Sequence, residues 1–164
     1  MKKILSIALA SILILLSVIL FTATYIDMVN VNYLFGPFLL GHWMAWIGAL
    51  FIALFTPLYS IFKRKYPKKW SVLVNIHAFG NLIAFILISG HFAQQISKPA
   101  SIYPDLGTGI TLYPIVLILV ITGLLQKYSI LKRFRRQIRF VHVSIVLSFY
   151  LVIVTHILQG LDIV

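Results

Sequence analysis

The amino-acid sequence predicts an all-α integral membrane protein that forms a five-helix transmembrane bundle. Of its 164 residues, 61% are hydrophobic and only 10% are charged, whereas soluble domains are about half apolar and a quarter charged. Several apolar runs reach the roughly 20 residues that a helix needs to cross a hydrocarbon core of about 30 Å. The basic residues gather in the short loops between these runs. We therefore expect one transmembrane domain, residues 1–164.

The predicted helices follow the apolar runs in order. They span residues 4–26, 38–62, 70–96, 107–126 and 137–161. The first run could be a signal peptide, but it is longer than the usual apolar core of about 7–15 residues, so we expect a retained helix. Trp43 and Trp46 near the start of the second run are typical of a membrane interface, and Pro57 can bend its far end.

Two loops with many positive charges predict the orientation of the bundle. Residues 63–69 and 127–136 each hold five Lys or Arg, and Lys2-Lys3 precede the first helix. Cytoplasmic loops carry the excess of Lys and Arg, so these segments are expected inside and the links 27–37 and 97–106 outside. The N-terminus is then inside and the C-terminus outside. The net charge of +11 comes mainly from these loops. We therefore expect a multi-pass protein of the plasma membrane, without a nucleic-acid partner.

Four histidines occur as two pairs with the same spacing. His77 and His91 are fourteen residues apart in the third helix, and His142 and His156 are fourteen apart in the fifth. Fourteen residues fall about 40° short of four full turns and cover about 21 Å, so each pair shares one face of its helix. The third and fifth helices run in the same direction, because the fourth returns between them. We therefore expect two facing pairs: His77 with His142 near the inner surface, and His91 with His156 near the outer one.

Haem explains this pattern better than another metal does. Ionisable residues inside a membrane mark functional sites, and imidazole is a common axial ligand of haem iron. Zinc requires its ligands around one ion, whereas each helix separates its own two histidines by about 21 Å. The sequence has no Cys, no Glu and only three Asp, which disfavours copper, manganese and iron–sulfur sites. We expect two non-covalent haem b groups; another metal, a proton path and a purely structural role remain alternatives.

Several further residues are candidates for contacts with these haems. Gly80 lies on the histidine face of the third helix, and Gly109 and Gly123 lie fourteen apart in the fourth, near the levels of the outer and inner pairs. Glycine permits close approach of a ligand, although small residues also serve helix packing in membranes. Arg139, one turn before the inner histidine of the fifth helix, could pair with haem propionates or with lipid headgroups.

His42 lies outside the repeated pattern, near the start of the second helix. It could serve an outer substrate or quinone site, although an interfacial position in contact with water is the simpler interpretation. Four polar residues flank the outer pair and could contact propionates or a substrate: Gln94, Gln95, Lys98 and Gln159.

The histidine pattern resembles the haem-binding core of known membrane proteins. Two parallel helices each carry two histidines separated by thirteen residues, and one helix lies between them in the chain. The pattern is similar to that of di-haem membrane cytochromes b and of the ferric reductase-like transmembrane family. The matching stretches run from 76–80 to 90–91 and from 139–142 to 156–160. The resemblance implies four axial ligands: His77, His142, His91 and His156. It covers more than half the chain.

The sequence also departs from these families. We find no flavin or nicotinamide domain after the bundle, no Pro-Glu-Trp-Tyr stretch and no second helical half. We therefore expect an electron-transfer component of an oxidoreductase, which carries electrons between an inner donor or quinol and an outer acceptor. Its partners would be redox proteins or quinone in a lipid membrane, with partner subunits or a homo-oligomer possible. The alternatives are a haem subunit of a larger quinone-linked complex and a non-redox histidine-lined transporter or membrane anchor.

Overall fold

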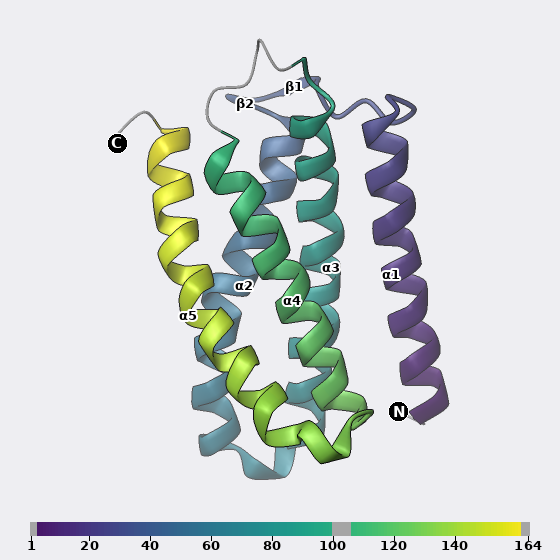
Figure 1. Ribbon diagram of the computed structural model, residues 1–164, viewed down its shortest axis with the longest axis vertical. Helices are drawn as coiled ribbons and strands as arrows, with labels where there is room; N and C mark the ends of the chain where they lie inside the picture. The colour runs from purple at the N-terminus through teal and green to yellow at the C-terminus, as the bar shows by residue number, and fades with distance from the viewer. Residues whose placement is uncertain (1–2, 100–105, 162–164) are drawn as a thin grey trace. The chain divides into compact units, whose positions relative to one another are not determined.

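The computed structural model describes residues 3–99 and 106–161 (Figure 1). The predicted all-α fold is confirmed, because the chain is 85% helical and five helices are long and apolar enough to span a membrane. Lys2, Pro104 and Asp105, which belong to the predicted loops, lie outside the described residues. The chain divides into two compact units, Met1–Ile102 and Tyr103–Val164.

The first unit contains three long helices and one short hairpin. The helices are α1 (Lys3–Tyr25), α2 (Leu40–Lys65) and α3 (Trp70–Ile96), and the strands are β1 (Leu34–Phe35) and β2 (Phe38–Leu39). In Figure 1, α1, α2 and α3 run in alternating directions. The predicted second helix, 38–62, starts two residues later because the hairpin occupies its first positions.

The hairpin depends on a two-residue turn. Gly36 has a φ of 65°, and the next residue, Pro37, can only take a negative φ. Glycine at the first central position is the requirement of a type II′ turn, which matches the twist of paired strands. The Trp43 indole donates a hydrogen bond of 2.7 Å to the Phe35 carbonyl, and this bond ties the hairpin to α2.

Small residues along α1 form its packing face. Ala10, Ser17 and Thr24 recur every seven residues and are 3%, 2% and 4% exposed. The Ser17 hydroxyl donates to the Ser89 hydroxyl at 2.9 Å, and the Ser89 hydroxyl donates to a carbonyl one turn earlier in α3. Small residues and hydroxyl bonds are the usual means of helix association in membranes. The packing of α1 on α3 therefore depends on small and hydroxyl side chains.

Gly48 allows α2 and α3 to approach closely. A Cβ at this position would lie 2.8 Å from the Ala84 carbonyl oxygen and 3.0 Å from Ile88 Cγ1. We expect Gly48→Ala to destabilise the protein by about 1–3 kcal/mol, because a backbone atom cannot yield as a flexible side chain does. Gly107→Ala is the control, since nothing lies within 4 Å of its added Cβ. Thermal unfolding in detergent compares the variants; an equal Tm for both would contradict the expected clash.

The second unit is a helical hairpin of α4 (Gly107–Tyr128) and α5 (Arg135–Gly160). Ser129 follows α4 with a φ of 53°, and the Ile130 amide donates to the Leu125 carbonyl at 3.2 Å. This left-handed residue and the bond across it form a Schellman motif, which ends the helix two residues beyond the predicted position 126. The short helix η3 (Lys132–Phe134) then leads into α5.

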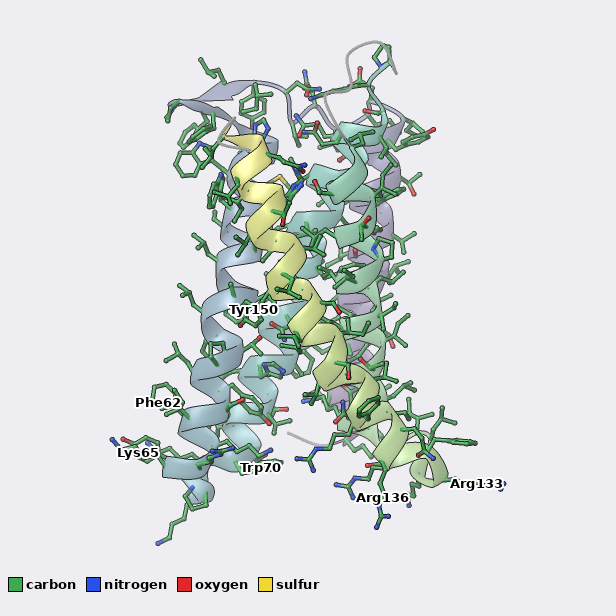
Figure 2. The ribbon with its side chains drawn as sticks, turned by 60° about the vertical axis from the view of Figure 1, so that its left-hand side comes forward. Phe62, Lys65, Trp70, Arg133, Arg136 and Tyr150 are labelled. Carbon is green, nitrogen blue, oxygen red and sulfur yellow. The ribbon has the colours of Figure 1, made fainter. Side chains whose placement is uncertain are left out.

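Basic side chains gather at one turn in each unit. The short helix η1 (Pro67–Lys69) connects α2 to α3, and Figure 2 shows Lys65 and Trp70 at this turn. The Lys63 ammonium lies 4.1 Å from the centroid of the Trp70 ring. Figure 2 also shows Arg133 and Arg136 at the turn from α4 to α5. Cations beside an aromatic ring at a helix end suit the headgroup level of a membrane.

Candidate histidine sites

Both histidines of α3 contact the neighbouring helix α2. The His77 ring stacks on the Tyr59 ring, with 4.4 Å between centroids and 12° between planes. The His91 ring lies 5.4 Å from the His42 ring, at 52°. Since both α3 histidines meet side chains of α2, they lie on the same side of α3, as their spacing predicts.

An amide accompanies His77 on its own helix. The Asn81 Nδ2 atom lies 3.4 Å from Nδ1 and 3.5 Å from Nε2 of His77, so this amide can donate to whichever ring nitrogen is unprotonated. The neutral ring thereby keeps a polar partner inside an apolar helix.

The position of Gly80 differs from the open approach that the sequence suggests. A Cβ on Gly80 would overlap the tip of the Phe51 ring, which lies directly against the glycine backbone. Phe51 itself stacks on Phe55 at 5.0 Å. The absence of a side chain at Gly80 therefore makes room for α2, and a cofactor could approach there only after Phe51 turns away.

His142 of α5 is held by a threonine of α4. The Thr122 Oγ1 atom lies 2.8 Å from His142 Nδ1 and 2.6 Å from the Ile118 carbonyl oxygen. A hydroxyl has one hydrogen, and two oxygens at 2.6 Å require a hydrogen between them. The Thr122 hydrogen lies on this carbonyl, so the hydroxyl oxygen can accept from Nδ1–H of His142, an arrangement that would leave Nε2 with a free lone pair. The backbone carbonyl of Leu119 is a second hydrogen-bond acceptor for the His142 ring.

His156 has an equivalent partner at the other end of the same pair of helices. The Thr108 Oγ1 atom lies 3.0 Å from His156 Nδ1 and 2.7 Å from Oε1 of Gln159. With the Gln159 amide in this orientation, Thr108 donates to the amide oxygen, and its own oxygen can accept from Nδ1–H of His156. The candidate ligand is again Nε2.

Gly109 and Gly123 follow these two threonines and contact the same two rings. A Cβ on Gly109 would lie 3.5 Å from His156 Cε1, and a Cβ on Gly123 would lie 3.5 Å from His142 Cε1. Each glycine thus lies at the level of one histidine of α5. We name the two dipeptides, Thr108-Gly109 and Thr122-Gly123, the Thr-Gly pairs; they are fourteen residues apart, like the histidines that they contact.

The remaining candidates lie near the helix ends. Arg139 is exposed in the first turns of α5. His42 is only half-buried, but its Nδ1 atom is buried and has no hydrogen-bond partner among the described residues. Gln94 is 1% exposed, and its amide donates to the Asn32 side chain at 2.6 Å. Gln94 therefore fixes the link before α2, and a Cβ on Gly41 would overlap it.

Within residues 3–99 and 106–161, no group of three or more His, Asp or Glu could hold a bare metal ion. A haem iron requires only two protein ligands, because the four porphyrin nitrogens occupy four of its positions and leave two for axial ligands. An imidazole with Nδ1–H bonded and Nε2 unprotonated is the form that binds a metal through Nε2.

The fold defines a multi-pass helical membrane protein with two histidines on each of two helices. No family model matches the chain, and neither the curated proteins nor the solved structures include a significant match to it.

Proposed function

We propose that the protein is a b-type di-haem membrane cytochrome that carries electrons across the plasma membrane, between an inner donor or quinol and an outer acceptor. The observation that carries this proposal is the state of the α5 histidines. In each ring, Nδ1 lies within hydrogen-bond distance of a threonine hydroxyl, at 2.8 Å for His142 and 3.0 Å for His156; under this proposal Nδ1 carries the hydrogen and Nε2 binds the iron. Haem iron with two imidazole ligands alternates between ferric and ferrous states and so supplies one-electron transfer.

The sequence supplies the pairing of the ligands. We pair His77 with His142 and His91 with His156, because the two helices have the same histidine spacing and the same direction in a five-helix topology. Under this proposal, each haem takes one ligand from α3 and one from α5. The neutral imidazoles avoid the large penalty of burying a charge in hydrocarbon.

Other side chains take supporting roles in the proposal. His42, 5.4 Å from His91 between ring centroids, would contact the acceptor or a quinone beside the outer haem. Arg139 would meet the propionates of the inner haem from its exposed position near the start of α5. Gly109 and Gly123 leave room for the histidine rings to lie close to α4. Gly80 would leave room for a haem only where the Phe51 ring moves aside.

The visible spectrum of the purified chain tests the proposal. After reduction with dithionite, we expect the sharp α and Soret bands of six-coordinate haem b, and about two haems per chain from the pyridine haemochrome. A colourless protein from haem-replete cells, which also fails to bind added haemin, would overturn the proposal. Such a protein would favour the histidine-lined transporter or membrane anchor instead. Reoxidation by a quinone analogue distinguishes a quinone-linked subunit from one with a different acceptor.

A further inference from the structure

We infer that the Thr-Gly pairs of α4 hold Nδ1 of both α5 histidines protonated, through Thr122 at His142 and through Thr108 together with Gln159 at His156. The two threonines are then positioning residues that prepare Nε2 of each ring for metal binding. The tautomer assignment does not depend on haem, whereas its effect on a reduction potential rests on the proposed function.

The first support is the repetition of one arrangement at two sites. A threonine hydroxyl meets Nδ1 at 2.8 Å for His142 and at 3.0 Å for His156. In both cases the following glycine leaves 3.5 Å between its virtual Cβ and the ring Cε1. Helix packing alone would explain small residues beside the two histidines. It would not explain why a hydroxyl lies next to Nδ1 at both sites.

The second support is the direction of the hydrogen bonds. Threonine in a membrane helix commonly donates to the carbonyl four residues earlier, as Thr111 does to Gly107 at 3.0 Å. Thr122 makes this bond to Ile118 at 2.6 Å, so its hydrogen is committed and its oxygen can only accept from His142. The backbone of α4 thereby determines which nitrogen of His142 carries the proton.

The two sites differ in what receives the threonine hydrogen. At His142 the acceptor is a backbone carbonyl, which cannot change its role. At His156 the acceptor is the Gln159 side-chain oxygen, 2.7 Å from Thr108 Oγ1. An amide that turns over would present its NH₂ group and donate to Thr108, which would then donate to Nδ1 of His156. The His142 tautomer is thus fixed, while the His156 tautomer follows the orientation of Gln159.

A hydrogen bond from Nδ1–H strengthens a histidine as a metal ligand. The bond moves electron density toward Nε2 and raises the basicity of the ligand, and a more basic ligand favours ferric over ferrous iron. Loss of the Thr122 hydroxyl should therefore raise the midpoint potential of the haem bound by His142 and leave the other haem unchanged. Loss of the Thr108 hydroxyl should raise the midpoint potential of the haem bound by His156 and leave that of the haem bound by His142 unchanged.

The ¹⁵N chemical shifts of the imidazoles test the inference in the full chain, produced under haem starvation and held in detergent. In the unaltered protein we expect Nδ1-protonated rings at both α5 positions. Thr122→Val should abolish the Nδ1-protonated form of His142 and leave His156 unchanged, and Thr122→Ser should retain that form. Gln159→Leu should change the tautomer of His156 and leave His142 unchanged. The matched control is Thr111→Val, on the same helix but without a histidine partner, which should change neither ring. Nε2-protonated His142 in the unaltered protein, or a His142 tautomer that Thr122→Val leaves unchanged, would overturn the inference.

Redox titration of the haem-loaded protein separates the two proposals. A raised potential at one haem in Thr122→Val, with the Thr111→Val protein unchanged, supports the positioning role. Equal potentials in all these variants would refute the effect on haem. If the protein binds no haem, the proposed function fails while the ¹⁵N result still decides whether the threonines set the tautomers.

Discussion

Replacement of His142 by leucine is expected to lower the haem content from about two to about one per chain, because a six-coordinate haem b needs both axial imidazoles. Leucine fills a similar volume and suits the hydrocarbon, so the helices should still insert. The pyridine haemochrome measures the loss. The reduced α band, resolved at low temperature, shows which haem remains. A His142→Leu protein with its full haem content would show that this residue is not a ligand.

Pairs of substitutions test which histidines share a haem. If His77 and His142 bind the same iron, the double variant His77→Leu/His142→Leu should lose no more haem than either single variant. The combination His77→Leu/His156→Leu should lose both haems, because it removes one ligand from each. Two single losses that add in the first double variant would contradict the pairing. His42→Leu is the matched control, since this residue is not a proposed ligand, and it should retain both haems.

The five helices could be predicted from the sequence because a membrane span follows from length and apolarity alone. The third helix was predicted at 70–96, and α3 is Trp70–Ile96. Larger differences arise where local contacts decide the end of a helix. The strands of the Gly36-Pro37 turn take the first positions expected for α2, and the Schellman motif at Ser129 lets α4 continue to Tyr128.

The candidate site could be predicted only in part. The spacing of the histidines and of Gly109 and Gly123 is visible in the sequence, but the threonines that precede these glycines were not identified. A threonine in a membrane helix ordinarily bonds to its own backbone, so its type alone gives no sign of a histidine partner. The signal that could have revealed them was the repeat of a Thr-Gly dipeptide with the histidine spacing.

The spacing of residues along one helix also could not predict the side-chain contacts between helices of the first unit. Periodicity places Gly80 on the histidine face of its helix, but it does not say which neighbour fills the space. The Phe51 ring lies there. The closeness of His42 to His91 likewise depends on how α2 packs against α3, which the spacing within one helix does not give.

The two glycines of the Thr-Gly pairs should tolerate alanine and reject leucine. At Gly123 an added Cβ would make ordinary van der Waals contact with His142 Cε1 at 3.5 Å, so Gly123→Ala should keep both haems. The larger side chain of Gly123→Leu must displace either the imidazole or α5, and overpacking of this kind typically costs about 1–3 kcal/mol. Because ligand position tolerates only small errors, we expect this variant to lose the haem that His142 binds and to keep the other.

The matching substitution at Gly109 makes the result specific to each site. Gly109→Leu should lose the haem bound by His156, whose Cε1 also lies 3.5 Å from the virtual Cβ. Leucine at Gly160, where nothing lies within 4 Å of an added Cβ, is the control for added bulk in a helix of the same unit. Haem content and reduced α-band spectra of the three leucine variants provide the measurement. Loss of the same haem from Gly109→Leu and Gly123→Leu would contradict the assignment of one glycine to each histidine, because a single site would then depend on two positions about 21 Å apart along α4.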